Sequence, residues 1–194
     1  SYSGQAFVHI GGVVGHCDVN IGPCVIENVV SVANIIFTGN TTGTNGNLYL
    51  GGIVGYLSAS SYEVDVKNCA NYGSVTLSGT AYDAYIGGIF GYSQGRGSTI
   101  NHDYIQNCLN YGTIAHSGTT VGTLYIGGIL GYTSSGTNIL ENCVSAGKII
   151  SNKASGYIGS TIGYAYSDTT VSHCYWSSDN SYNKACGSGN PTIT

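Results

Sequence analysis

The stretch LYIGGILGY, from Leu124 to Tyr132, decides the fold because related stretches occur at five places in the chain. The others are FVHIGGVVGH (7–16), LYLGGIVGY (48–56), AYIGGIFGY (84–92) and GYIGSTIGY (156–164). The first glycine of each stands at Gly11, Gly51, Gly87, Gly127 and Gly159, so the spacings are 40, 36, 40 and 32 residues. An active-site glycine loop occurs once in a domain. Five evenly spaced copies instead indicate a repeat architecture.

A second block follows each glycine stretch in the same order. These blocks are IENVVSVANI (26–35), VKNCANYGSV (66–75), IQNCLNYGTI (105–114), LENCVSAGKI (140–149) and VSHCYWSSDN (171–180). Length differences fall in the connectors between the blocks, where insertions are tolerated. We therefore divide the chain, residues 1–194, into one domain of five repeats, at about 7–46, 47–83, 84–122, 123–155 and 156–194. The last repeat is degenerate and is expected to act as a cap.

The blocks read as short strands bounded by Gly and Asn, and no apolar stripe has the 3.6-residue period of a helix. About three strands fit in each repeat, whereas a propeller blade of this length usually has four. We therefore predict an all-β fold, a parallel β-solenoid (β-helix) of about five coils, with three short strands per coil and near-zero helix. An antiparallel sandwich or a propeller is the alternative.

Within the glycine stretch, both phases of the strand alternation carry apolar residues. One phase is expected to face the core, with the second glycine of each pair leaving room for close contact between opposing walls. The other phase is expected to face outward and to form an interface between subunits, because contiguous exposed apolar columns mark such surfaces. Its residues are Tyr49, Ile53, Tyr85, Ile89, Tyr125, Ile129 and Tyr157. The alternative is that connectors of the same chain cover this face.

Two further columns are expected to be structural. Asn28, Asn68, Asn107 and Asn142 share one repeat position, where an asparagine ladder would hydrogen-bond along the stack at a corner. Cys69, Cys108, Cys143 and Cys174 share the next position, and Val29 in the first repeat indicates a site for a small buried side chain. Gly73 and Gly112 are expected to supply positive φ at a second corner.

The remaining cysteines lie off this column. Cys17 and Cys24 flank the short loop CDVNIGPC and are candidates for a local disulfide. The total of seven cysteines is odd, so at least one sulfur would be free or would pair with another chain. The scattered histidines and the lack of a CxxC pair predict no metal site.

Composition narrows the classes of function. Only 7% of the residues are charged, the net charge is −4, and five Lys plus Arg give no basic footprint for nucleic acid. No apolar run reaches the roughly 18 residues of a membrane helix, so no membrane insertion is expected. The acidic residues form no recurring cluster. His102 and Asp103 come closest to an acid–base pair, but we expect them in a solvated loop and predict no catalytic residue and no cofactor.

The segments GGIVGY, GGIFGY and GGILGY, each followed by an NC block, resemble the GLUG motif of bacterial and protist surface or secreted proteins. The resemblance covers nearly all of the chain as five imperfect units. It implies a right-handed β-solenoid on an extracellular stalk, adhesin or fibre. GLUG repeats that accompany secreted proteases are accessory regions without the active site.

These observations predict a non-enzymatic structural repeat protein, extracellular or at a cell surface, which assembles with itself into a filament or surface layer. Its partner would be further copies of the chain, bound end to end and laterally. The alternative is a carbohydrate- or surface-binding adhesin or stalk module, with tyrosine columns stacking against a glycan. The C-terminal tail, which contains Trp176 and ends in PTIT, is expected to fold back as a cap or to add a strand to another subunit.

Overall fold

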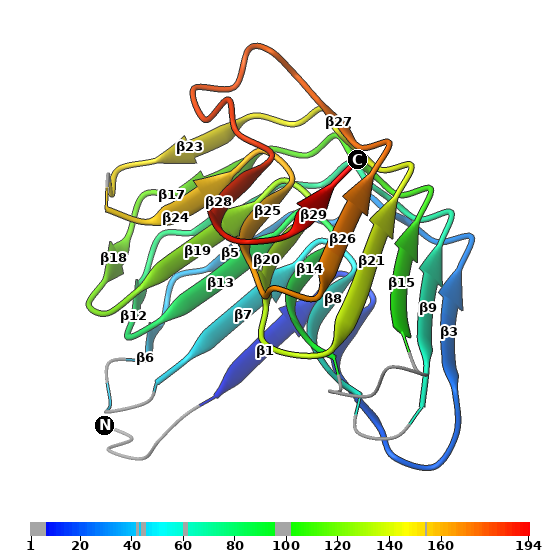
Figure 1. The fold of residues 1–194 in the computed structure, drawn as a ribbon. Coiled ribbons are helices and arrows are strands. Elements are labelled where there is room, and N and C mark those ends of the chain that lie inside the picture. Colours follow the sequence, from blue (N-terminus) through cyan, green and yellow to red (C-terminus); the bar gives the residue numbers. More distant parts are fainter. Residues whose placement is uncertain (1–6, 42, 44–45, 60–61, 96–101, 154) are drawn as a thin grey trace.

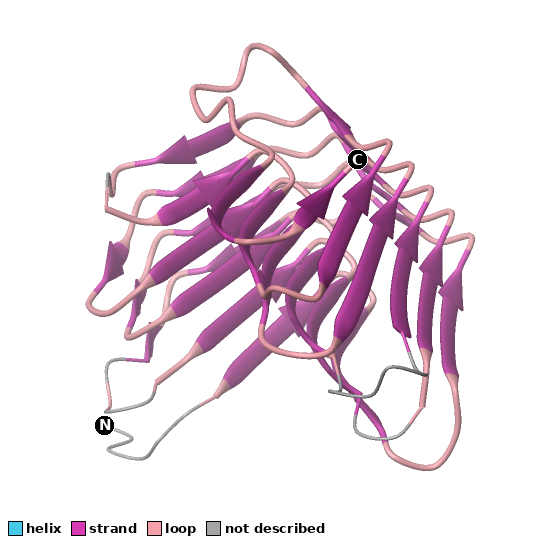
Figure 2. Ribbon diagram, in the orientation of Figure 1, coloured by secondary structure: helices cyan, strands magenta, loops and turns pink. Residues whose placement is uncertain are grey.

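The computed structural model describes residues 7–41, 43, 46–59, 62–95, 102–153 and 155–194. None of these residues lies in a helix (Figure 2), so none forms an apolar helix that could span a membrane. Every pairing between strands is parallel, with equivalent positions of successive repeats side by side. The predicted all-β parallel β-solenoid is confirmed.

The strands form six sheets, which we letter A to F. Sheet A contains β1 (Val8–Gly11), β7 (Leu48–Gly51), β13 (Ala84–Gly87), β19 (Leu124–Gly127) and β24 (Tyr157–Gly159). Sheet B contains β2 (Val14–Val19), β8 (Val54–Ala59), β14 (Phe90–Gln94), β20 (Leu130–Thr133), β25 (Ile162–Ala165) and β28 (Cys186–Gly189). Sheet C contains β3 (Cys24–Glu27), β9 (Val64–Lys67), β15 (His102–Gln106), β21 (Thr137–Glu141), β26 (Thr169–Ser172) and β29 (Thr192–Ile193). Figure 1 shows the strands of sheet C stacked in chain order.

The other three sheets are built from shorter strands. Sheet D contains β4 (Val30–Ser31), β10 (Ala70–Asn71), β16 (Leu109–Asn110), β22 (Val144–Ser145) and β27 (Tyr175–Trp176). Sheet E contains β5 (Ile35–Phe37), β11 (Val75–Leu77), β17 (Ile114–His116) and β23 (Ile149–Ser151). Sheet F contains β6 (Asn40–Thr41), β12 (Thr80–Ala81) and β18 (Thr119–Thr120).

This strand count differs from the prediction of five coils with three strands each. Among the described residues, a complete coil visits all six sheets, and the number of stacked strands varies from three in sheet F to six in sheets B and C. The extra strands arise because the glycine stretch and the NC block each bend sharply and divide into separate strands. Strands of two or three residues carry too little periodicity to be recognised in a sequence.

The interior is divided into two apolar cores. Sheet A packs its inner residues, such as Leu50 and Ile86, against sheets E and F, whereas sheet B packs Val54 and Phe90 with residues of sheet C. Between the two cores, a Cβ atom at Gly52 would stand 2.4 Å from the side-chain amide carbon of Asn71 in β10. The second glycine therefore allows close contact with the opposing wall, as predicted.

The paired glycines also explain one wrong prediction. Ile53, Ile89 and Ile129 do not face outward; each is 0% exposed and belongs to the core between sheets B and C. The chain bends between β7 and β8, so the strand alternation restarts there, and neighbours such as Ile53 and Val54 are both buried. This aliphatic column is not available to a partner.

The prediction of positive φ at Gly73 and Gly112 is wrong, because neither glycine has a positive φ. A Cβ atom at Gly73 would lie 1.9 Å from the carbonyl oxygen of Ala33, and one at Gly112 would lie 1.9 Å from that of Gly73. Close stacking of the backbone, rather than a left-handed conformation, excludes larger residues there.

The C-terminal tail folds back onto its own chain. β28 pairs with β25 and β29 pairs with β26, so the tail adds a partial coil to sheets B and C. Asn180 accepts a hydrogen bond from the Ile149 backbone amide at 2.8 Å, which satisfies an edge group of β23. Tyr182 packs against the core beneath sheet A. The tail therefore folds back, one of the two arrangements that the sequence left open, and its strands β28 and β29 become edge strands of sheets B and C.

Candidate functional site

The two predicted structural columns behave as expected. Asn28, Asn68, Asn107 and Asn142 all have φ between 53° and 58°, and His173 continues the column at 49°. The amide of Asn68 donates to Asn28 Oδ1 at 3.3 Å, and that of Asn107 donates to Asn68 Oδ1 at 3.1 Å. Asparagine tolerates the left-handed region better than most residues, which accounts for its recurrence at this corner.

The cysteine column consists of packed thiols. Cys69, Cys108 and Cys143 are buried, Cys174 is partly buried, and all four are free. Hydrogen bonding to neighbouring thiols, together with burial, raises the pKa of Cys69 and Cys143 above the ordinary range. The four packed thiols serve as small core residues, as predicted.

The structure brings Cys17 and Cys24 together without a covalent bond. Their sulfur atoms are 3.4 Å apart, and both thiols are free. Burial, followed by the hydrogen bond with Cys24, raises the pKa of Cys17 to about 12. The pair is well placed for oxidation, while the disulfide itself stays a prediction.

The pair His102–Asp103 does not form an acid–base site. Both residues belong to strand β15 and not to the solvated loop that we expected. Asp103 is buried and accepts a hydrogen bond from Ser93 Oγ at 3.1 Å, whereas the His102 ring packs beside Tyr104. Burial raises the pKa of Asp103 to about 6. Among the described residues, no group of three or more His, Cys, Asp or Glu side chains is placed to hold a metal ion.

The tyrosine columns form a continuous aromatic surface where sheets A and B meet. We call it the tyrosine crease; it consists of Tyr49, Tyr85, Tyr125 and Tyr157 from sheet A and Tyr56, Tyr92, Tyr132 and Tyr164 from sheet B. Along each column the rings stack, with centroids 4.9 to 5.3 Å apart and interplanar angles of 4° to 23°. Across the crease they meet edge to face, as Tyr49 and Tyr56 do at 4.9 Å and 70°.

Stacking makes the crease a poor sugar platform. A pyranose binds to an open aromatic face, but each inner ring has its faces covered by the rings of neighbouring coils. Tyr49 is 5% exposed and Tyr85 is 9%, while Tyr157 at the end of the column is 39% exposed. Burial raises the pKa of both Tyr125 and Tyr132 to about 12. Tyr49 and Tyr85 are therefore covered within the chain, and Tyr125 and the four rings of sheet B are partly buried, so the columns do not form the open outer face that we expected.

In the first coil, the crease contains histidine in place of tyrosine. His9 and His16 occupy the positions that hold tyrosine in the later coils, and their ring centroids are 4.7 Å apart. They line a cavity of about 230 Å³ together with Phe7, Tyr49 and Tyr56. Burial, with a smaller contribution from His16, lowers the pKa of His9 to about 4, so its imidazole is neutral at pH 7. Aligning FVHIGGVVGH with the other stretches was the signal that could have revealed this pair.

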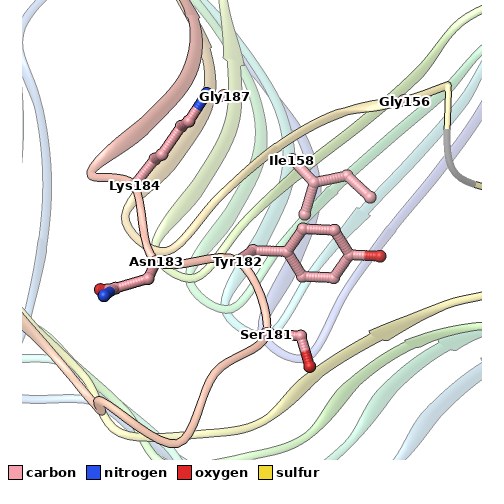
Figure 3. Close-up of a pocket in the computed structure, with 7 residues that line it drawn as sticks. All are labelled: Gly156, Ile158, Ser181, Tyr182, Asn183, Lys184 and Gly187. Carbon is pink, nitrogen blue, oxygen red and sulfur yellow. The ribbon is translucent and has the colours of Figure 1, made fainter.

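A second cavity, of about 250 Å³, lies beneath the C-terminal tail (Figure 3). The ring of Tyr182 lies beside Ile158, and the side chain of Lys184 points away from that ring. Its lining contains no acidic residue, cysteine or histidine.

One group of exposed apolar residues lies on sheets D and E and in the short turns between them. We call it the outer apolar face; its residues are Val30, Val32, Ile36, Tyr72, Tyr111, Val144, Ile150 and Tyr175, which are 38% to 75% exposed. Ile36 and Ile150 belong to one column, separated by Thr76 and Ala115. Lys148 is the only Lys, Arg, Asp or Glu in the segments that form this face. The sequence pattern did not reveal this surface because each of its strands has only two or three residues.

In comparisons with known proteins, no family model, no curated protein and no solved structure matches this chain. The geometry of the described surfaces is therefore the basis for a functional proposal.

Proposed function

We propose that this chain is a non-enzymatic structural protein, an extracellular or cell-surface β-solenoid that assembles with copies of itself into a filament or surface layer. The outer apolar face is the observation that carries the proposal. Soluble monomers rarely expose contiguous apolar patches larger than a few hundred Å², and larger ones mark interaction sites. Eight residues of extended chain by four stacked strands give an area on the order of 500 Å² for this face together with the small and polar residues between its apolar ones, such as Thr76 and Ala115.

The chemistry of the face favours another copy as the partner. A standard interface buries about 800 Å² on each side, so the apolar face with its polar border has nearly the required size. The single charge at Lys148 provides little of the electrostatic pattern that selects a charged partner. Branched aliphatic and tyrosine side chains in strand register can pack against the same columns of a second solenoid.

The ends of the stack supply a second contact. β28 and β29 are the last strands of sheets B and C, and β2 and β3 are the first strands of the same sheets. Terminal strands present unpaired backbone groups that can pair with another chain. Strands β2 and β3 of one copy can therefore extend the parallel sheets of the next beyond β28 and β29.

The proposal also includes a cellular location and a second candidate function. The low charge and the resemblance of the repeat to the GLUG motif support an extracellular location and a fibre, stalk or adhesin role. A glycan-binding adhesin is the second candidate, because Tyr72 and Tyr111 on the outer apolar face are 50% and 63% exposed. Unlike the rings inside the crease, these two leave aromatic surface open to solvent.

The test is assembly of the purified chain, measured by sedimentation and electron microscopy over a range of concentrations. We expect oligomers or fibres for the wild type and their loss in the double variant Ile36→Lys, Ile150→Lys. Ile21→Lys with Val121→Lys is the matched control, since both residues are exposed but lie off the face. A wild-type chain that stays monomeric throughout would overturn assembly, and a glycan array would then test the adhesin role.

A further inference from the structure

The histidine pair at the start of the crease is a chemical exception within a regular structure. In the second coil the crease contains Tyr49 and Tyr56, and the equivalent positions in the first coil contain His9 and His16. The substitution replaces two phenol rings with two imidazoles at once, on neighbouring strands β1 and β2. Imidazole has a ring nitrogen that binds transition metals, whereas neutral tyrosine is a poor ligand.

The two imidazoles are held in place by the rings around them. His9 stacks on Tyr56 at 4.8 Å and contacts Tyr49 at 4.9 Å, and His16 meets Tyr56 edge to face at 5.0 Å. A site whose ligands are already ordered loses little conformational entropy when it binds. Both rings also line the same cavity of about 230 Å³, which has room for an ion with bound water.

The spacing of the pair suits one shared ion. With metal–nitrogen bonds of about 2.0–2.1 Å in tetrahedral geometry, two imidazoles on one ion have ring centres roughly 5 Å apart. The centroids of His9 and His16 are 4.7 Å apart, with an angle of 63° between the ring planes.

We propose that His9 and His16 bind one divalent transition-metal ion that prefers imidazole, such as Ni²⁺, Zn²⁺ or Cu²⁺, with one ring nitrogen each and water in the remaining positions. The affinity follows the usual order, with Cu²⁺ bound most tightly. Mg²⁺ and Ca²⁺, which prefer oxygen ligands, do not compete. The site does not depend on self-assembly, since both ligands belong to one chain.

The other histidines do not form such a pair. The two ring nitrogens of His116 are near Thr120 Oγ1 at 3.0 Å and Ser151 Oγ at 3.4 Å inside the protein. His173 ends the asparagine column, and His102 packs beside Tyr104. His173 therefore provides a control for binding to an isolated histidine.

The experiment is a titration of the full chain with Ni²⁺ and Zn²⁺ by calorimetry, using His9→Tyr and His16→Tyr. Each substitution installs the tyrosine of the later coils, so the fold is expected to persist, as circular dichroism and thermal unfolding would verify. We expect one ion per chain, and each variant should bind at least about tenfold more weakly, as loss of a direct ligand requires. His173→Asn, which restores the asparagine of the other repeats, should bind like the wild type.

A second measurement does not depend on any variant. Substoichiometric Cu²⁺ should broaden the ring resonances of His9 and His16 in the NMR spectrum before those of the other histidines. Equal broadening of all five histidines, unchanged affinity in both tyrosine variants, or an equal loss in His173→Asn would overturn the site.

Discussion

The tyrosine crease and the outer apolar face contain the same kinds of side chain but differ in curvature. In the crease, two sheets meet at an inner angle, so the rings of sheet A pack edge to face on the rings of sheet B. On the outer apolar face, no adjacent sheet of the described chain covers the side chains, and residues such as Ile36 and Ile150 are more than half exposed. Apolar columns of this solenoid are therefore covered where two sheets meet at an inner angle and stay exposed where the chain turns outward.

The largest expected effect comes from a charge at the isoleucine column that we first placed on the surface. Ile89→Lys puts an unpaired ammonium group into the core between sheets B and C and should destabilise the fold by roughly 5 kcal/mol or more. Chemical denaturation monitored by circular dichroism would measure the loss. The same change at Ile150, on the outer apolar face, is the control and should leave the free energy of unfolding within about 0.5 kcal/mol. A folded, stable Ile89→Lys variant would contradict the burial described above.

The sequence repeats were sufficient to predict a parallel β-solenoid. They were insufficient to predict the path of one coil, that is, its number of strands and which side chains face outward. Repeated identities set the parallel register, so the asparagine and cysteine columns could be predicted residue by residue. The prediction that Ile53, Ile89 and Ile129 face outward is wrong for one reason. It assumes that inward and outward side chains alternate without a break across the glycine pair, whereas the chain bends there and a new strand begins. The histidine pair was missed for another reason, because His9 and His16 meet across this bend and not within one strand.

A smaller effect is expected from removing one ring of the crease. Tyr85 stacks between Tyr49 and Tyr125, at 4.9 Å from each, so Tyr85→Ala breaks the column and leaves a void. Truncation of a buried aromatic residue costs about 3–5 kcal/mol. Tyr111→Ala, on the outer apolar face, is the matched control, with a change within about 0.5 kcal/mol expected. Similar losses of unfolding free energy in the two variants would show that the rings of the crease are packed no better than those of the outer apolar face.

Removal of a tyrosine hydroxyl group from the crease is expected to have the smallest effect on the unfolding free energy at neutral pH. Burial raises the pKa of Tyr85, Tyr125 and Tyr132 above the ordinary value of 10, to about 12 for the last two. Because the folded state retains these protons while the unfolded chain begins to lose them near pH 10, stability should be full below pH 10 and should fall as the pH rises toward 12.

Tyr85→Phe tests this linkage directly. It should cost no more than about 1 kcal/mol at pH 7, since it removes a single hydroxyl from a ring whose packing persists. It should also move the alkaline unfolding midpoint to higher pH, because one group that must ionise in the unfolded chain is gone. Circular dichroism and phenolate absorbance, followed together, would show whether the crease ionises only as it unfolds. Phenolate formation from the crease tyrosines well before the loss of β-structure would mean that water reaches them, and the crease would then be as open to a ligand as the outer apolar face.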